Sequence, residues 1–586
     1  MRYAIDRVPF STFGSWMSLS IPAGERQLFV RNHHMRANNL FSIEVVANGQ
    51  RITPRVDQTA TKLVCWAGEG HIEICFESPG TIRLRGHGVG AMFTGKRIVA
   101  YQNGDNLAVF NIRRAFRRYQ FEALSGTLQL IGAYVSQEED LENLAEHQGG
   151  GDFSILEGLD RDQPAIVVQP DADRGTWELA IDAFWSSWER PERAPFETCL
   201  AKSEAAFRMF HDAFTPAPAP LQETQERAVY IDWASTVAPC GLVKRPTIFM
   251  SKNWMNNVWS WDQCFNAMAM AKAHPALAMD QMLTLVDHQD EFGSYTDAFN
   301  DMEMHYNYSK PPVHGFTMQE LLPRLPTKPA SDVLETMYDS LGRQADWWMR
   351  YRVLEPVDGK ISSYRSLPYY LHGNDSGWDN STMFSKGVPL VSPDLSALLV
   401  LQMDVLSALA ADLDKMDAAE MWQNRANALF AGLMAELWQE NHFAARLGNT
   451  GERVECQSLI PWLPLILGKR LPEAVRAMLK AGMVEHLTEW GLATEKVDSP
   501  CYIPDGYWRG PIWAPSTYLA VVGLERSGYA DLANDVARRF CKLCAKSGFA
   551  ENFDAVTGEP LRDPAYTWTA SVFLLLAERM GGRWNV

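Results

Sequence analysis

Segment 373–384, GNDSGWDNSTMF, places an indole beside a carboxylate in a stretch of turn-forming residues. Because tryptophan is costly to leave in water, a loop that carries Trp378 usually packs the ring against something. Burial of this kind raises the pKa of a carboxylic acid, so Asp379 could stay protonated and act as a proton donor. Trp378 and Asn380 would then contact the bound molecule. The simpler alternative, a helix N-cap with a packed tryptophan, is left open by this segment alone.

Glu551 is the second candidate carboxylate, and it stands between Phe549 and Phe553 in segment 548–558, GFAENFDAVTG. Taken alone it is best interpreted as a surface residue on a turn, because glutamate is rarely buried without a purpose. The alternative is a base held in a partly dry pocket. Cleavage of a glycosidic bond needs two carboxyl groups: one protonated, to help the leaving oxygen depart, and one ionised, to activate water.

Three further loops carry residues that suit a sugar. In segment 257–265, NVWSWDQCF, Asp262 could be an N-cap or could accept two hydrogen bonds from hydroxyls, with Trp261 beside it. In segment 309–315, SKPPVHG, two prolines fix the shape of a loop that presents Lys310. The stretches DGYWRGPIWAP and YTWT supply the remaining candidates for substrate binding: Tyr507, Trp508, Arg509, Gly510, Trp513 and Trp568.

Neither a cofactor nor a metal ion is expected from the sequence. Asp301, Glu303 and His305 alternate along the chain, which could bind a cation but is better interpreted as a solvated loop. Cys541 and Cys544 form a C-x-x-C pair without a second pair or nearby histidines to complete a zinc set. We therefore expect these two cysteines to pack inside a helix.

The composition limits the partners. The formal net charge of −17 over 586 residues argues against nucleic acid, whose phosphates would be repelled, and disfavours an anionic membrane surface. The N-terminus lacks the apolar core of a signal peptide, and we find no run of about 18 apolar residues. Nine scattered cysteines do not resemble a disulfide framework, which favours a reducing cytoplasm. We expect a cytoplasmic protein with a small carbohydrate substrate, and the sequence leaves the oligomeric state open.

Residues 1–215 are expected to form an antiparallel β-sandwich. Apolar and polar residues alternate in segments 72–76 and 177–181, as in strands with one buried face. Turn signals recur between such segments, for example Ala47-Asn48-Gly49 and Asn103-Gly104-Asp105. This domain carries no cluster of catalytic type, so we expect it to support or flank a site elsewhere.

Residues 221–586 are expected to form a helical domain, after the stiff connector DAFTPAPAP at 212–220. Apolar residues recur every three or four positions in segments 334–348 and 395–406. Further helical stretches are expected at 263–290, 418–438, 471–489, 515–527, 530–547 and 566–580. A domain of this length holds roughly twelve helices, which suits a closed double ring, the (α/α)6 barrel. An open solenoid is disfavoured because no sequence repeat is visible.

Several of these motifs together resemble glycoside hydrolase family 63 and, more weakly, the related family 37 trehalases. The motifs are WSWD at 259–262, DSGWDNS at 375–381, GYWRGPIW at 506–513, ENFDAVTGEP at 551–560 and YTWTAS at 566–571. The resemblance implies an (α/α)6 barrel preceded by a β-sandwich, and hydrolysis with inversion at the anomeric carbon. The family includes α-glucosidases and hydrolases of mannosylglycerate and glucosylglycerate.

The resemblance also implies roles for individual residues. Asp379 matches the general acid, and Glu551 matches the general base. Trp261 and Asp262 match residues around the glucose in the subsite that holds the cleaved sugar. The loop that walls this subsite is matched by Tyr507, Trp508, Arg509, Gly510 and Trp513.

Two departures from the family pattern concern the substrate. The usual S-Q-P-P is here Ser309-Lys310-Pro311-Pro312, and the lysine could favour an anionic aglycone such as glycerate or could simply point outward. Trehalases tend to have glutamate where this chain has Asp375, which weakens the trehalase assignment.

The sequence therefore predicts an inverting, exo-acting α-glycosidase, in the first place an α-glucosidase acting on a small glucoside or oligosaccharide. Alternatives are a glucosylglycerate or mannosylglycerate hydrolase, a trehalase, and a sugar-binding protein that kept the site without the chemistry. A sugar epimerase, which relies on paired histidines, is disfavoured because His305, His314 and His372 are spread thinly.

Overall fold

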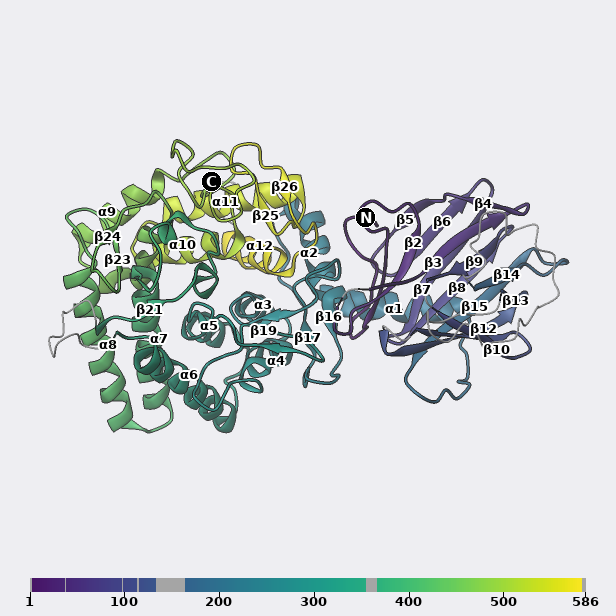
Figure 1. Cartoon of the computed structure of the whole chain (residues 1–586), viewed down its shortest axis with the longest axis horizontal. Helices are drawn as coiled ribbons and strands as arrows, with labels where there is room; N and C mark the ends of the chain where they lie inside the picture. Colours follow the sequence, from purple (N-terminus) through teal and green to yellow (C-terminus); the bar gives the residue numbers. More distant parts are fainter. Residues whose placement is uncertain are drawn as a thin grey trace. The chain divides into compact units, whose positions relative to one another are not determined.

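The computed structural model describes residues 3–36, 38–96, 98–112, 115–132, 164–354 and 366–581. It divides into two compact units (Figure 1). The first unit takes in the chain up to Asp212 together with two short later segments, Trp233–Pro239 and Ser251–Asn256. The second unit consists of Ala213–Asp232, Cys240–Met250 and the chain from Asn257 onward. The sequence predicted one boundary between residues 215 and 221 and gave no sign of the two short segments.

The first unit is a sandwich of two antiparallel sheets. One sheet has the order β1-β2-β3-β9-β14-β13, with β4 beside β3. Its strands are β1 (Met17–Ser20), β2 (Leu28–Asn32), β3 (Asn38–Ala47), β4 (Gln50–Ile52), β9 (Gly90–Thr94), β13 (Thr127–Ile131) and β14 (Ala165–Gln169).

The other sheet has the order β10-β11-β12-β15-β8-β7-β6-β5. Its strands are β5 (Arg55–Gln58), β6 (Leu63–Ala67), β7 (Gly70–Ser78), β8 (Thr81–His87), β10 (Val99–Gly104), β11 (Leu107–Ile112), β12 (Arg117–Ser125) and β15 (Thr176–Phe184). Helix α1 (Phe196–His211) packs on β7.

The alternation seen in the sequence accounts for the sandwich core. Ile72 and Ile74 of β7 and Leu179 and Ile181 of β15 are buried in one cluster that draws on both sheets. Successive side chains on a strand point to opposite faces, so these residues share one face and their polar neighbours the other. The predicted turn at Asn48 joins β3 to β4 with a positive φ of 51°. The prediction of an antiparallel sandwich is confirmed.

The second unit is a double ring of helices (Figure 1). Six described segments contact one another in a closed cycle, in the order α3, α5, α7, η9, α10, α12 and back to α3. They are α3 (Asp262–Met270), α5 (His314–Leu321), α7 (Pro393–Asp412), η9 (Ile460–Arg470), α10 (Ala514–Arg526) and α12 (Thr567–Met580). The outer helices are α2 (Gln222–Ser235), α4 (Pro275–Val286), α6 (Ser331–Tyr351), α8 (Met416–Glu436), α9 (Glu473–Val484) and α11 (Ala530–Ser547).

The inner segments are buried nearly all round, which is the expected state of a helix enclosed by others. One described helix, α7, is long and apolar enough by length and composition to cross a membrane. In this structure 78% of its apolar window is buried, as for the other inner segments. The two cysteines Cys541 and Cys544 are buried in α11, as predicted, and all nine cysteines are free thiols.

Two helical segments differ from the prediction because of proline. The stretch 263–290 forms two helices, α3 and α4, since Pro275 starts the second one and its ring cannot continue the first. The inner segment η9 was not predicted at all. It contains Pro464 and a left-handed Gly468, which break the regular period of apolar residues.

Short strands and turns form the loops that precede the inner segments. These strands are β18 (Val258–Trp259), β19 (Ala298–Phe299), β20 (Met304–His305), β21 (Tyr369–Tyr370), β22 (Leu390–Val391), β23 (Ala445–Leu447), β24 (Arg453–Val454), β25 (Asn552–Phe553) and β26 (Pro560–Leu561). Inner and outer helices alternate along the chain, so the inner segments run in one direction and their N-termini meet at one end of the ring. The loops that carry the candidate site residues at 257–265, 309–315, 373–384, 505–515 and 548–558 each lead into an inner segment: α3, α5, α7, α10 and α12 respectively.

Candidate active site

The loop that carries Asp379 is fixed by the neighbouring carboxylate of Asp375. Its Oδ1 accepts a hydrogen bond from the Ser309 amide at 2.9 Å, and its Oδ2 accepts from Arg352 Nη1 at 3.0 Å and from the Leu371 amide at 2.8 Å. Asp375 is buried, and both of its carboxylate oxygens accept hydrogen bonds from other residues of the protein. Asp375 lies in the turn η7 (Gly373–Ser376), and its bonds tie that turn to Ser309, Arg352 and Leu371. A second turn, η8 (Thr382–Phe384), follows Asp379.

Asp379 itself is held between a glycine and an amide. A Cβ at Gly373 would lie 2.0 Å from the Asp379 carbonyl oxygen, so only glycine allows this approach. In the amide orientation that satisfies both groups, Asn374 Nδ2 donates to both Asp379 carboxylate oxygens at 2.9 Å. By turning over, an asparagine can instead accept from a protonated carboxyl group, so it suits both states of a proton donor. Burial raises the pKa of Asp379, against the opposing charge of Lys310.

Glu551 is buried at the start of β25, so the interpretation as a surface turn residue is wrong. Its Oε1 accepts a hydrogen bond from the Tyr507 hydroxyl at 3.0 Å, and its amide donates to the Asp563 carbonyl at 2.8 Å. Burial, and after it the charge of Asp563, raises the pKa of Glu551 to about 7, while the Tyr507 bond lowers it. A carboxylate with this pKa is a stronger base than an exposed one.

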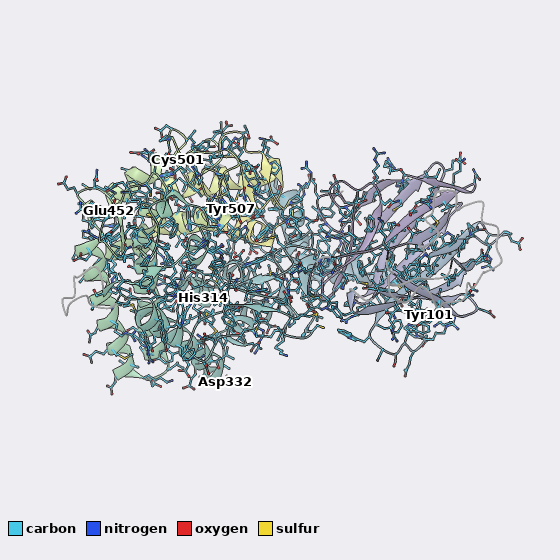
Figure 2. The ribbon with its side chains drawn as sticks, in the orientation of Figure 1. Tyr101, His314, Asp332, Glu452, Cys501 and Tyr507 are labelled. Carbon is cyan, nitrogen blue, oxygen red and sulfur yellow. The ribbon has the colours of Figure 1, made fainter. Side chains whose placement is uncertain are left out.

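Tyr507 of the second unit (Figure 2) interacts with both candidate catalytic groups: its hydroxyl donates to Glu551, and the charge of Asp379 acts on it. Its backbone takes a left-handed φ of 63°, which is strained for a residue with a side chain. Burial raises the pKa of the Tyr507 hydroxyl, and the charges of Glu551, Asp379 and Asp262 raise it further, in that order. The charges of three carboxyl groups that are far apart in the sequence therefore raise the pKa of a single phenol.

Lys310 is the cation among these acids. Its Nζ lies 3.1 Å from Asp297 Oδ1 and donates to the Asn374 carbonyl at 2.9 Å. Its charge lowers the pKa values of Asp379, Asp262 and Asp297, each of which burial raises. Lys310 is buried, so the alternative that it points outward is wrong.

Asp262 is the first residue of α3 and also faces this cluster. The Tyr566 hydroxyl donates to its Oδ1 at 3.3 Å. Burial raises the pKa of Asp262 well above its usual value, and the nearby charge of Glu551 adds to the effect. An acid that is both buried and only partly hydrogen-bonded has oxygens left to accept bonds from sugar hydroxyls.

The predicted tryptophans form one cluster of rings. Trp508 stacks on Trp513 at 4.0 Å and contacts Trp378 at 4.6 Å between ring centroids. Trp568 meets Trp261 edge to face at 5.4 Å and Trp513 at 5.5 Å. All five side chains are at most 3% exposed. The rings therefore use much of their surface on one another and form a rigid apolar support that desolvates the carboxylates.

Three other predicted binding residues make bonds that shape the loop 506–510. Asn380 Nδ2 donates to the Gly506 carbonyl at 3.0 Å, and its Oδ1 accepts from the Trp508 amide at 2.9 Å. Arg509 Nη2 donates to the Cys501 carbonyl at 3.3 Å. Gly510 has a φ of 151° and no room for a Cβ. Contacts of these residues with a substrate stay predictions.

Four residues of the site were missed in the sequence. They are Asn374 beside Asp379, Asp297 beside Lys310, Asp563 beside Glu551 and Tyr566 beside Asp262. Asn374 and Tyr566 lie within quoted segments, 373–384 and 566–571, so membership of the motif was an available signal. Asp297 and Asp563 lie outside the quoted motifs, so the sequence gave no comparable signal for them.

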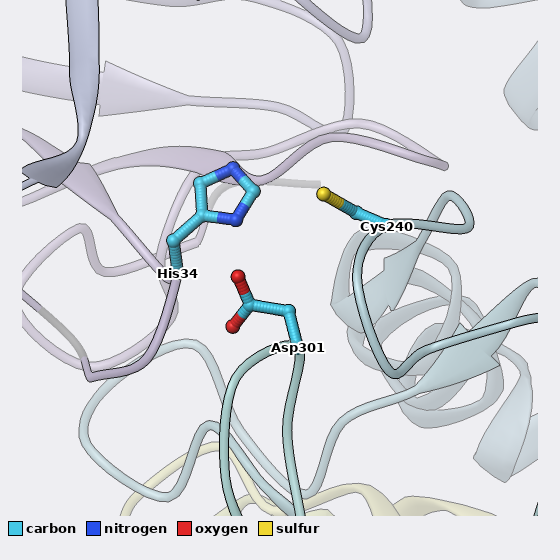
Figure 3. A group of neighbouring side chains, drawn as sticks. All are labelled: His34, Cys240 and Asp301. Atoms are coloured by element: carbon cyan, nitrogen blue, oxygen red, sulfur yellow. The ribbon is translucent and has the colours of Figure 1, made fainter.

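The expected loop with Asp301, Glu303 and His305 does not gather three ligand atoms in the described chain. His305 Nε2 lies 3.6 Å from Glu303 Oε2. The Asp301 carbonyl instead accepts from the Leu242 amide at 2.8 Å, and Asp301 and Cys240 lie on two neighbouring loops of the second unit (Figure 3). Gly241 permits this contact, since a Cβ there would lie 2.1 Å from the Asp301 carbonyl oxygen.

Comparison with known proteins gives one family match and several relatives. The family described as mannosylglycerate hydrolase MGH1-like glycoside hydrolase domain matches residues 255–569. Mannosylglycerate hydrolase of Thermus thermophilus is 30% identical over 130 residues, 21% of this chain and 30% of the relative. Glucosylglycerate hydrolase of Mycolicibacterium hassiacum is 35% identical over 71 residues, 12% of this chain and 16% of the relative. A solved bacterial glucoamylase complexed with acarbose has a TM-score of 0.63 at 12% identity, covering 99% of this chain and 94% of its own.

These matches differ in what they cover. The chain spans less than half the length of the curated relatives that it matches. The glucoamylase likeness concerns the fold alone, and it covers both the sandwich and the (α/α)6 barrel, which confirms the predicted fold class. The family match includes every candidate site residue from Trp261 to Trp568.

Gly377 offers a test of how the acid loop is positioned. Its φ is 73°, and a Cβ there would lie 2.6 Å from the Trp261 ring. We expect Gly377→Ala to displace the loop and lower hydrolytic turnover by tenfold or more, since a shift of about 1 Å can cost about 100-fold. The matched control is Gly387→Ala, which has a φ of 111° and nothing within 4 Å of the new Cβ. Equal turnover in the two variants would show that the loop tolerates the contact.

Tyr507→Phe tests the tuning of the base. The hydroxyl lowers the pKa of Glu551, so its removal raises that pKa. A general base works only when ionised, so if Glu551 is the base that the sequence predicts, we expect the wild type to lose activity as the pH falls through about 7. We expect the acidic limb of the kcat/KM–pH profile to move to higher pH. Tyr502→Phe, which removes a hydroxyl that makes no hydrogen bond in this structure, serves as the control. A limb that stays in place or moves to lower pH in Tyr507→Phe contradicts the assignment.

Proposed function

The chain belongs to the MGH1-like glycoside hydrolases of family 63, and on that premise we propose that it hydrolyses a small α-linked glycoside of glycerate with inversion. The sugar released is glucose or mannose. The cleaved unit lies at the end of its substrate, so the enzyme acts in an exo fashion. The observation that carries this proposal is that a buried carboxyl group, Glu551, and a half-buried one, Asp379, both raise the pKa of the Tyr507 phenol.

In the proposed mechanism Asp379 protonates the glycosidic oxygen. Its raised pKa keeps a proton available, and Asn374 can bind both the acid and the carboxylate formed after transfer. Glu551 deprotonates a water molecule that attacks the anomeric carbon from the opposite face. Inverting enzymes separate the two carboxyl groups by about 6.5–9.5 Å, which leaves room for this water.

The remaining site residues hold the sugar and exclude solvent. Asp262 offers carboxylate oxygens to sugar hydroxyls, and Tyr566 orients that carboxylate. The tryptophan cluster keeps the site apolar, so charges formed in the transition state act over a low local dielectric. We further propose that the parts of Tyr507, Trp508 and Arg509 that remain accessible line the subsite of the cleaved sugar.

The glycerate aglycone is supported by the relatives, which are a mannosylglycerate hydrolase and a glucosylglycerate hydrolase. A neutral α-glucoside, the first interpretation of the sequence, remains the second candidate. It is favoured by one observation: the Lys310 ammonium already contacts Asp297 and the Asn374 carbonyl, and this leaves little of its charge for an aglycone. Trehalose is the weakest candidate, because Asp375 is fully engaged with Ser309, Arg352 and Leu371.

The roles of the two carboxyl groups can be separated by the leaving group. Asp379→Asn and Glu551→Gln should each lower turnover of a natural glycoside by several orders of magnitude, with Glu559→Gln, an exposed carboxylate on the same segment, as control. The phenolate of an aryl glycoside with an acidic phenol can leave without being protonated. Such a substrate should therefore restore activity to Asp379→Asn but not to Glu551→Gln. Proton NMR during the first turnovers should show the β-anomer released from an α-glycoside.

Release of the α-anomer would mean retention and would contradict the proposed mechanism. Sugar binding with no release of monosaccharide by the wild type would instead favour the non-catalytic alternative. Restoration of Glu551→Gln by the aryl substrate would exchange the assigned roles.

The aglycone can be tested with wild type and Lys310→Gln on a panel of glucosylglycerate, mannosylglycerate and neutral α-glucosides at low and high salt. We expect the wild type to favour the glycerates, more so at low salt, because a carboxylate is attracted by cations near the site. In Lys310→Gln the pKa of Asp379 rises, so the basic limb of the pH profile should move to higher pH with every substrate.

A wild-type preference for neutral glucosides would overturn the glycerate assignment and leave the glycosidase assignment intact. A loss in Lys310→Gln that is confined to the glycerates would place the ammonium on the aglycone rather than on the acid.

A further inference from the structure

A set of possible metal ligands lies on the β-sandwich, in the unit that the proposed hydrolase mechanism does not use. His71 of β7 is the direct partner of His87 on the antiparallel strand β8. Glu73 stands two residues after His71 on the same strand, and side chains two apart on a strand share one face. Strand pairing thus brings two imidazoles and one carboxylate to the same patch of the sheet.

The ligand atoms of these three residues are close together. One ring nitrogen from each histidine and one Glu73 oxygen all lie within 4.8 Å of one another. The ring centroids of His71 and His87 are 4.7 Å apart, and His87 Nε2 lies 3.7 Å from Glu73 Oε2. The two rings are stacked with their planes 21° apart, so at least one ring must turn before both nitrogens point at one ion. A tetrahedral ion with ligands at about 2.0–2.1 Å would then draw the ligand atoms to somewhat over 3 Å.

The charge states of these groups also suit a metal ion. Burial and then the charge of His87 lower the pKa of His71, so its imidazole is neutral at neutral pH, which is the form that binds metals. Burial alone would raise the pKa of Glu73, but hydrogen bonds from Arg85 and Lys62 outweigh it and keep the carboxylate ionised.

Arg85 and Lys62 play the part of supporting groups around this carboxylate. Arg85 Nε donates to Glu73 Oε2 at 3.0 Å, and Lys62 Nζ donates to Oε1 at 3.1 Å. Ligating carboxylates are commonly hydrogen-bonded by further side chains in this way. Arg85 also pairs with Glu197 at 2.7 Å, so it keeps a carboxylate partner when an ion draws charge from Glu73.

We propose that His71, Glu73 and His87 form a binding site for Zn²⁺ or a similar divalent transition-metal ion, with water in the fourth position. Two imidazoles and one carboxylate are a ligand set that zinc accepts readily, whereas calcium and magnesium prefer oxygen ligands alone. The ion would bridge β7 and β8 within the eight-stranded sheet. Because it binds the folded sheet, it would raise the melting temperature of this unit.

The test is zinc binding to the full chain, freed of metal with a chelator and titrated against a chromophoric competitor. We expect saturable binding by wild type, and its loss from His87→Ala and His71→Ala across the range that saturates wild type. The control is His442→Ala, a half-buried histidine outside the sandwich that pairs with one carboxylate, Glu455, at 3.0 Å. Melting curves without metal show whether each variant is folded, and His87→Gln replaces any variant that is not.

Co²⁺ provides a second measurement on the wild-type chain. Two nitrogen and two oxygen ligands predict an intense tetrahedral visible spectrum without a thiolate-to-cobalt band. The proposal is overturned by an absence of saturable binding, by binding that folded His71 and His87 variants retain, or by a thiolate band that places the ion on a cysteine. Glycosidase activity should be the same with and without zinc, so this test is independent of the proposed function.

Discussion

The second unit depends on one physical constraint: several carboxyl groups must be kept away from water. Glu551, Asp379, Asp262 and Asp297 are all largely buried, and for each of them burial is the main cause of a raised pKa. Concentrating acids in this way is costly unless some are protonated or paired. Here one ammonium, Lys310, pairs with part of the group, and hydrogen bonds from phenols and an amide satisfy the rest.

The tryptophan cluster and the ring of helices provide that burial. Trp261, Trp513 and Trp568 lie at or next to the first residues of α3, α10 and α12, so the ring places them together at one end. Their mutual contacts leave little room for movement, and they fix the loops that carry the acids. The fold therefore controls the protonation of the site through the same contacts that hold its loops in place.

Much of this arrangement could be predicted from sequence. Alternation at 72–76 and 177–181 indicated the sandwich, and the apolar periodicity of α6, α7, α8 and α11 indicated the helices. The regular rules failed where proline intervenes: η9 with Pro464 has no clear period, and Pro275 divides one expected helix into two. The local spacing of apolar residues predicts a regular helix or strand well, but it predicts a helical segment that contains proline poorly.

The sequence predicted which residues belong to the candidate site, but not which of them contact one another. Asp379 and Glu551 were found from their neighbours in the chain, whereas the pKa of Glu551 depends on Tyr507, which comes from another loop, and on Asp563, beyond strand β26 of the same loop. Trp508 and Trp513 were expected to contact the substrate, but their stacking on each other uses one face of each ring internally. Lys310 could not be placed from sequence, because its partners Asp297 and Asn374 lie outside the motif that carries it.

The proposed mechanism depends most directly on the distance between the Asp379 and Glu551 carboxyl groups when substrate is bound. A crystal structure of the enzyme with a non-hydrolysable glycoside measures this distance and shows any water held against Glu551. We predict a separation of about 6.5–9.5 Å, with a water molecule between Glu551 and the anomeric carbon and the glycosidic oxygen beside Asp379. A separation of about 5 Å, or a sugar bound away from these two residues, would contradict it.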